Sequence, residues 1–260
     1  MGFFGKKKTD NAAKTELMAR IGAICDPNTG ETLAQSGVIE RLDVNGQTVN
    51  LELVFDYPER STVAQLRKSL AEAVKSVNAD YQLELVSAFV APVGSIQSGQ
   101  PFSGAKNIIA VASGKGGVGK SSTSVNLALA LQAEGAKVGL LDADIYGPSQ
   151  PTMLGTHKKP EQVGEKGLKP ITVRGLATMS IGYLVDEKTA MVWRGPMVTS
   201  ALMQLLNDTQ WPGLDYLIVD MPPGTGDVQL TLAQKVPVAG SVIVTTPQNI
   251  ALMDAQKAIN

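Results

Sequence analysis

Glycines and lysines between residues 113 and 122 (SGKGGVGKSS) have the types and spacing of a phosphate-binding loop. Gly114, Gly119, Lys120 and Ser121 fit the pattern G-x-x-x-x-G-K-[ST]. Glycines lack the Cβ atoms that would keep backbone N–H groups from converging on an anion, and the N-terminus of a following helix adds partial positive charge. The run therefore predicts a site for ATP.

Lys120 and Ser121 are the two residues of this loop whose side chains have direct roles. We expect the Lys120 ammonium to reach the β and γ phosphates and the Ser121 hydroxyl to bind Mg²⁺. A glycine-rich turn that binds nothing is the alternative, which the flanking strand and helix disfavour. The expected nucleotide contacts are Gly114, Lys115, Gly116, Gly117, Val118, Gly119, Lys120, Ser121 and Ser122.

Three carboxylates follow apolar strands in the same half of the chain. Asp142 and Asp144 end the run at 138–144 (VGLLDAD). Asp220 ends the run at 217–220 (LIVD), which is the Walker B pattern. An Asp at a strand end beside Mg²⁺-ATP holds metal-bound water or orients the attacking water. We predict that Asp142 and Asp220 bind Mg²⁺ through water and that Asp144 is catalytic; capping of a turn or helix is the alternative for Asp142 and Asp144.

The segment after the Walker B strand, residues 221–227 (MPPGTGD), looks like a loop that senses the γ-phosphate. Its glycines permit movement, and its prolines restrict the backbone conformations that the loop can adopt. We expect it to lie beside the phosphate loop.

Alternating strands and helices must position these motifs. Short apolar strands are expected at 108–112, 138–141, 216–219 and 241–245, with one helix from the phosphate loop to about residue 134 and another at 250–259. This alternation is typical of a parallel sheet with crossover helices, in which ligands bind at the carboxyl ends of the strands.

A smaller unit precedes this sheet. The sequence predicts a short helix at 12–25, strands at 38–44 and 48–55 joined by Asn45-Gly46, a helix at 61–77 with Ser61 as N-cap, and a strand at 82–90. The expected fold class is therefore α/β: a parallel-sheet P-loop NTPase domain preceded by a small α+β domain. The expected boundaries are a flexible N-terminus at 1–11, the small domain at 12–90, a linker at 91–106 and the NTPase domain at 107–260.

Composition excludes several classes of protein. The sequence has 43% apolar residues and a net charge of −1, which is typical of a globular protein and gives no basic footprint for nucleic acid. No apolar run is long enough to cross a bilayer, and no secretory signal is present, so no membrane partner is expected. The single cysteine, Cys25, excludes a disulfide within the chain and favours the reducing cytoplasm.

The second lysine of the loop, Lys115, gives the form GKGGVGK[ST]. This deviant motif resembles the class of ATPases that contains the ParA, MinD, nitrogenase iron protein and Mrp families. The resemblance implies that Lys115 reaches across a homodimer to the partner's phosphates, in the manner of an arginine finger worth roughly 10³–10⁵ in rate. A solvated loop lysine is the alternative.

Three stretches narrow the resemblance to the Mrp/ApbC family of iron–sulfur cluster carriers: 142–149 (DADIYGPS), 192–197 (VWRGPM) and 220–227 (DMPPGTGD). Residues 12–90 resemble the small iron–sulfur-assembly domain often fused ahead of bacterial Mrp proteins. The resemblance implies a homodimer that binds or hydrolyses ATP, carries a [4Fe–4S] cluster and delivers it to apo iron–sulfur proteins. Trp193-Arg194 would lie near the dimer face or the nucleotide, or serve packing alone.

The chain departs from the family in its cysteines. The family holds its cluster with a C-x-x-C motif downstream of Walker B, and this motif is absent here. A cluster normally needs about four thiolates, whereas a homodimer of this chain offers two copies of Cys25. Because the chain ends at Asn260, before the segment that in relatives contacts adenine and carries the C-x-x-C motif, we expect that it is truncated at its C-terminus. Cys25 is expected to be a small core residue, with transient ligation as the alternative, and His157 is expected in a surface loop.

Three functions remain open from the sequence. The first is an ATP-hydrolysing iron–sulfur cluster carrier. The second is a ParA- or MinD-like positioning ATPase, which the fused N-terminal unit and the absence of a basic surface disfavour. The third is a truncated nucleotide-binding module that does not bind a cluster.

Overall fold

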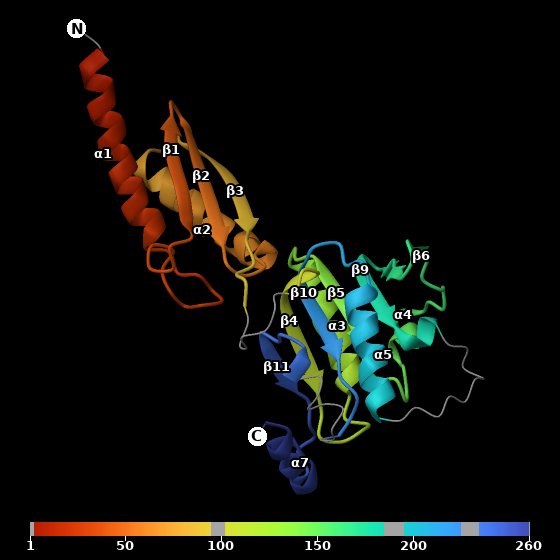
Figure 1. Cartoon of the computed structure of the whole chain (residues 1–260). Helices are drawn as coiled ribbons and strands as arrows, with labels where there is room; N and C mark the ends of the chain where they lie inside the picture. The colour runs from red at the N-terminus through yellow and green to blue at the C-terminus, as the bar shows by residue number, and fades with distance from the viewer. Residues whose placement is uncertain (1–2, 95–101, 185–194, 225–233, 260) are drawn as a thin grey trace. The chain divides into compact units, whose positions relative to one another are not determined.

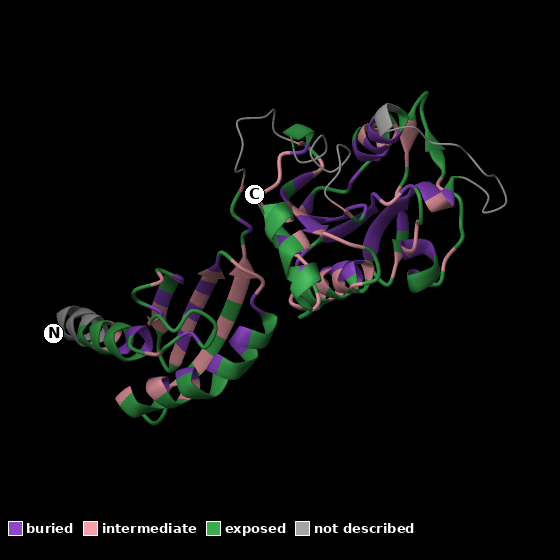
Figure 2. Ribbon diagram, turned by 90° about the horizontal axis from the view of Figure 1, so that it is seen from below, coloured by how far each residue is buried: buried purple, intermediate pink, exposed green. Residues whose placement is uncertain are grey.

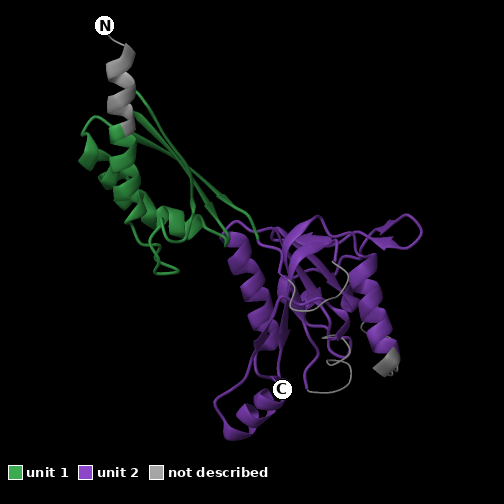
Figure 3. Ribbon diagram, turned by 60° about the vertical axis from the view of Figure 1, so that its left-hand side comes forward, with its two compact units in different colours: residues 1–91 green, residues 92–260 purple. Residues whose placement is uncertain are grey.

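The computed structural model describes residues 3–94, 102–184, 195–224 and 234–259 (Figure 1). The chain divides into two compact units, Met1–Ala91 and Pro92–Asn260 (Figure 3). Residues 95–101 of the expected linker lie outside the described residues. No helix in the described ranges is both long and apolar enough to cross a membrane.

The first unit is a three-stranded sheet with two helices. Its elements are α1 (Phe3–Gly22), β1 (Ile39–Asn45), β2 (Thr48–Phe55), α2 (Arg60–Val77) and β3 (Gln82–Phe89). Strands β1 and β2 are antiparallel, with Asn45 opposite Thr48, which confirms the hairpin. Strand β3 pairs with β2 in parallel. The small α+β class is therefore confirmed.

Two local expectations for this unit are wrong. Helix α1 spans Phe3–Gly22, so it begins before and ends before the short helix expected at 12–25. Helix α2 begins at Arg60 with Glu59 at the N-cap position and no side-chain capping bond, so Ser61 is not the cap.

The core of the first unit lies between β2 and its helices. Every second residue of β2 is buried, as period-2 alternation requires for a sheet with one covered face (Figure 2). The buried residues of β2 and α2 belong to one apolar cluster: Val49, Leu51, Leu53, Phe55, Val63, Leu66, Leu70 and Val74. Leu17 and Ile21 of α1 also belong to this cluster.

The second unit is built on a six-stranded sheet in the order β11-β4-β10-β5-β9-β8. Its strands are β4 (Ala105–Ala112), β5 (Val138–Asp142), β8 (Ile171–Val173), β9 (Leu176–Ser180), β10 (Leu214–Asp220) and β11 (Gly240–Ile243). Its helices are α3 (Lys120–Ala133), α4 (Gln150–Leu154), α5 (Gly195–Asp208) and α7 (Asn249–Ile259), with the 3₁₀ turn η1 (Ile181–Tyr183). A separate hairpin pairs β6 (Gln162–Val163) with β7 (Gly167–Leu168).

All pairs among the first five strands are parallel, and β8 joins the edge antiparallel to β9. Helices α3 and α5 lie on opposite faces of the sheet (Figure 3). The α/β fold with a largely parallel sheet is therefore as expected. Strands β8 and β9 had no sequence signal strong enough to predict them, because both are short and β9 includes Thr178 and Ser180.

Strand order places the motifs together. Strand β4 leads to the phosphate loop and lies between β11 and β10. Strand β10 lies between β4 and β5, with Asp220 opposite Val111 on one side and Asp142 on the other. Because the strands are parallel, the loops after β4, β5 and β10 emerge at one edge of the sheet.

Candidate nucleotide-binding site

The phosphate loop runs from the end of β4 to the start of α3. Gly119 occupies the N-cap of α3 with φ of 92°, a left-handed conformation that favours glycine over residues with a Cβ. Helix α3 then begins at Lys120, so its N-terminal N–H groups lie at the loop. Ser113 Oγ donates to the Lys115 carbonyl at 2.9 Å, and Gly224 N donates to the Ser113 carbonyl at 3.0 Å. The second bond ties the phosphate loop to the loop after β10.

Position 114 requires a glycine for a different reason: helix α7 packs so close to the loop that a side chain at this position would not fit. A Cβ built on Gly114 would lie 2.6 Å from the carbonyl carbon of Asp254 and 2.7 Å from its Cβ. Such distances force a backbone to shift. The loop and α7 are therefore packed directly against each other, and a side chain at position 114 would separate them.

Lys120 forms a buried ion pair with Asp220. Its Nζ lies 2.6 Å from Asp220 Oδ1, and the two side chains are 7% and 0% exposed. Ser124 Oγ also donates to Asp220 Oδ1 at 2.9 Å, and Lys120 Nζ lies 3.3 Å from Ser121 Oγ. Three of the predicted site residues, Lys120, Ser121 and Asp220, are thus brought together by β4, α3 and β10.

Asp142 and Asp144 lie in the same network. Asp142 is fully buried and accepts hydrogen bonds from Ser180 Oγ at 3.1 Å and from the backbone N of Asp144 at 3.2 Å. Burial, followed by repulsion from Asp220, raises the pKa of Asp142 to about 7. Burial also raises the pKa of Asp144, whereas the Lys120 ammonium acts to lower it.

The contacts of Asp142 and Asp144 are compatible with both roles considered for them, which are action on Mg²⁺-ATP and capping of a turn or helix. Asp142 Oδ2 accepts from the backbone N of Gln150, the first residue of α4, and Asp144 Oδ1 accepts from Gly147 N at 3.2 Å. Each carboxylate therefore fixes a turn or a helix start. Asp142 also interacts electrostatically with Asp220, and Asp144 interacts with both Lys120 and Asp220.

Comparisons with known proteins agree with this geometry. A family model described as NUBPL iron-transfer P-loop NTPase matches residues 104–260, and one described as iron-sulfur cluster assembly protein matches residues 14–84. The iron-sulfur cluster carrier protein of Escherichia coli (strain K12) is 49% identical over 254 residues, which are 97% of this chain and 69% of that protein. The chain belongs to this family of P-loop NTPases.

Two further matches cover mainly the second unit. The iron-sulfur cluster transfer protein NUBPL of Mus musculus is 56% identical over 160 residues, which are 61% of this chain and 50% of that protein. A nucleotide-binding protein in complex with ADP from Archaeoglobus fulgidus is 40% identical, with a TM-score of 0.52, and the match covers 60% of each chain. The chain spans 50% of the mouse relative and 69% of the one from Escherichia coli.

The remaining residues of the phosphate loop lie at or near the protein surface. Lys115 and Val118 are half-buried in the loop, and Gly116 and Gly117 are exposed there. Ser122 is exposed in the first turn of α3. His157 is exposed in a loop, as expected. Trp193 and Arg194, and residues 225–227 of the expected sensing loop, lie outside the described residues.

Cys25 does not have the core position that we expected. It is exposed and forms an isolated bridge with Thr32, while its neighbour Asp26 is fully buried. The turn that follows α1 places Asp26, rather than Cys25, inward, where Asp26 accepts a hydrogen bond from the Tyr57 hydroxyl. Helix α1 ends at Gly22, so its apolar pattern does not extend to Cys25.

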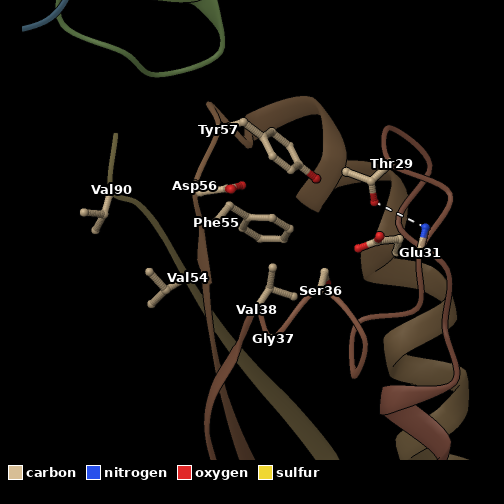
Figure 4. Close-up of a pocket in the computed structure, with 10 residues that line it drawn as sticks. All are labelled: Thr29, Glu31, Ser36, Gly37, Val38, Val54, Phe55, Asp56, Tyr57 and Val90. Atoms are coloured by element: carbon tan, nitrogen blue, oxygen red, sulfur yellow. Dashed lines mark hydrogen bonds between the residues drawn. The ribbon is translucent and has the colours of Figure 1, made fainter. Parts of the chain in front are cut away.

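A pocket of about 350 Å³ lies beside this turn in the first unit (Figure 4). Residues of the segment at 29–38 line it, together with Phe55 at the end of β2 and Tyr57 just after that strand. Two carboxylates, Glu31 and Asp56, are also among its lining residues. No group of three or more His, Cys, Asp or Glu residues suited to a metal ion occurs in the described parts of the chain.

The raised pKa of Asp142 predicts a pH-dependent stability. A carboxyl whose pKa rises from 3.8 to about 7 on folding holds its proton more tightly when folded, so its contribution to stability is lost as the pH rises through this range. Asp142→Asn has no such proton. Without nucleotide and Mg²⁺, we expect the free energy of unfolding of the wild type to fall relative to Asp142→Asn between pH 5 and 7, by at most about 1.4 kcal/mol per pH unit.

Urea unfolding followed by tryptophan fluorescence measures this difference. Both tryptophans, Trp193 and Trp211, belong to the sequence of the second unit, so the signal reports on the unit that contains Asp142. Parallel pH curves for the two proteins would contradict a raised pKa at this position.

Proposed function

We propose that this chain binds ATP with Mg²⁺ and hydrolyses it. The observation that carries the proposal is the network in which Lys120, Ser121 and Asp220 meet at the carboxyl edge of β4 and β10. This edge is where parallel α/β sheets bind their ligands. Membership in a P-loop NTPase family supports the same chemistry.

Each side chain of the network has a proposed role. When ATP binds, the Lys120 ammonium leaves Asp220 and contacts the β and γ phosphates, and Ser121 binds Mg²⁺ directly. Asp142 and Asp220 hold Mg²⁺ through water, and Asp144 orients the water that attacks the γ-phosphate. Lys115 reaches the phosphates of a second copy in a homodimer, where its charge offsets the negative charge that develops during transfer.

We further propose that the chain acts as an iron–sulfur cluster carrier that delivers [4Fe–4S] clusters to apo iron–sulfur proteins. The names of the relatives and the match of residues 14–84 to an iron–sulfur cluster assembly model support this function over a positioning ATPase. The 260 residues contain one cysteine, Cys25, which does not by itself satisfy a cluster that needs about four thiolates. In this proposal the cluster is cargo that the chain delivers.

Replacing Asp144 tests the hydrolytic proposal. Asp144→Ala should lower kcat about 10²-fold or more, because positioned groups of this kind contribute about that much, whereas ATP affinity should change little. Colorimetric phosphate release gives kcat, and calorimetry gives affinity. Asp208→Ala, at the end of α5, is the matched control for loss of a carboxylate. A normal rate in Asp144→Ala would assign Asp144 to structure alone.

Cluster transfer needs its own experiment. The chain is incubated anaerobically with ferrous iron and sulfide, freed of excess reagents, and mixed with an apo iron–sulfur enzyme whose activity reports the arrival of a cluster. The proposal expects visible absorbance on the chain and activation of the acceptor. Loss of both would refute the carrier function of this chain while leaving ATP hydrolysis intact.

A further inference from the structure

Gln150 joins three parts of the site that the motifs do not connect. It begins α4 and is 1% exposed. Its side-chain Nε2 donates to Asp220 Oδ2 at 2.9 Å and to the Ser121 carbonyl at 3.0 Å. Its backbone N donates to Asp142 Oδ2 at 3.1 Å. One residue thus contacts the Walker B carboxylate, the phosphate loop and the carboxylate after β5.

The orientation of this amide follows from its partners. Both neighbours of Nε2 are oxygens that only accept hydrogen bonds, so a flipped amide would place its oxygen against them. The two N–H groups are therefore used, and Oε1 faces elsewhere. Oε1 is buried and has no hydrogen-bond partner among the residues that the structure describes. A buried acceptor without a donor is uncommon and requires an explanation.

The partners of Asp220 show what Gln150 does. Lys120 and Ser124 both donate to Asp220 Oδ1, whereas Gln150 donates to Oδ2. When Lys120 leaves Asp220 for the phosphates, the carboxylate would keep its position only through its remaining donors. Gln150 is the donor that also contacts Ser121, the expected Mg²⁺ ligand.

We propose that Gln150 is a positioning residue for Mg²⁺-ATP: its amide holds Asp220 in place beside Ser121, and its free Oε1 accepts a hydrogen bond from a water molecule of the incoming Mg²⁺-ATP complex. This inference rests on the proposed function. Gln150 does not touch the reacting atoms in this scheme. Gln150 fixes the position of Asp220. Loss of Gln150 should therefore reduce the gain in ATP affinity that Mg²⁺ provides, and should not affect the binding of the phosphates by Lys120.

Gln150→Leu tests the proposal, because leucine fills a similar volume and removes both the donor and the acceptor. Calorimetry of ATP binding is performed with Mg²⁺ and with EDTA. We expect the gain in ATP affinity that Mg²⁺ provides to fall about tenfold, as for loss of one hydrogen bond to a charged group, while affinity in EDTA stays close to wild type. We also expect the half-saturating Mg²⁺ concentration for hydrolysis to rise and kcat to fall more than KM changes.

Gln132→Leu is the matched control. Gln132 lies in α3, and its Nε2 donates to the Arg174 carbonyl at 2.9 Å, so this variant loses a side-chain amide bond outside the network. Its response to Mg²⁺ should match the wild type. If Gln150→Leu does not fold, Gln150→Glu serves instead: it keeps the shape but, when ionised, replaces the donor facing Asp220 with a negative charge, and it should weaken the Mg²⁺ response in the same direction.

The outcomes separate the proposals. Wild-type binding of Mg²⁺-ATP together with an unchanged Mg²⁺ response in folded Gln150→Leu or Gln150→Glu would overturn the role of Gln150 alone. Equal losses of affinity with Mg²⁺ and with EDTA would also overturn it, because they would indicate a structural role. Absence of any heat with wild-type protein, ATP and Mg²⁺ would overturn the proposed function and this inference with it.

Discussion

Lys120→Ala should abolish measurable ATP binding. The Lys120 ammonium is the full positive charge that the loop offers to the β and γ phosphates, and backbone N–H groups alone provide partial charge. The structure adds a second effect, because Lys120 is also the cation paired with fully buried Asp220. Removal of one partner of a buried ion pair leaves an uncompensated charge and costs about 3–5 kcal/mol of stability.

A double variant separates these two effects. Lys120→Met combined with Asp220→Asn removes both charges at similar volume, so the free energy of unfolding should recover toward the wild-type value. ATP binding should not recover, because no ammonium is present. Calorimetry measures binding, and urea unfolding followed by tryptophan fluorescence measures stability of the second unit. ATP binding by the stable double variant with wild-type affinity would refute the role of Lys120.

Lys115→Ala should leave ATP binding nearly intact and remove turnover. The Lys115 side chain is half-buried, and its backbone carbonyl accepts from Ser113 Oγ, so the loop should keep its conformation in the variant. In the part of the chain that the structure describes, Lys115 forms no ion pair. If it acts on the phosphates of a second copy as an arginine finger does, kcat should fall by roughly 10³–10⁵.

A mixing experiment tests whether Lys115 acts across a dimer. The Lys115→Ala chain still binds ATP, and the Lys120→Met/Asp220→Asn chain still carries Lys115. Neither should hydrolyse ATP alone. In mixed dimers, ATP bound to the first chain meets Lys115 of the second, so hydrolysis should reappear. Full activity of Lys115→Ala alone would show that Lys115 is a solvated loop residue, and no recovery on mixing would exclude action across the dimer.

Local patterns in the sequence predicted the phosphate loop, the strand ends at Asp142 and Asp220, and the hairpin at Asn45-Gly46. Each depends on residues close together in the chain, such as glycines that free the backbone or apolar residues at a regular period. The strands that carry these motifs were predicted within a few residues of their observed bounds. Parallel pairing followed from their alternation with helices.

Errors arose where long-range packing decides. Cys25 was expected in the core, but the fold buries Asp26 instead. Ser61 was expected to cap α2, which begins one residue earlier without a side-chain cap. Short strands β8 and β9 had no periodic signal, because their burial comes from neighbouring strands and not from their own pattern.

What the sequence by itself determined is the chemistry that this chain offers to a nucleotide: an amide-lined loop, two lysines and three carboxylates at strand ends. Only the tertiary structure decided which of these groups touch. Lys120 and Asp220 are 100 positions apart, and Gln150 and Asp220 are 70 apart. Such pairs form because parallel strands bring distant loops to one edge of a sheet, and no pattern within a single segment records that contact.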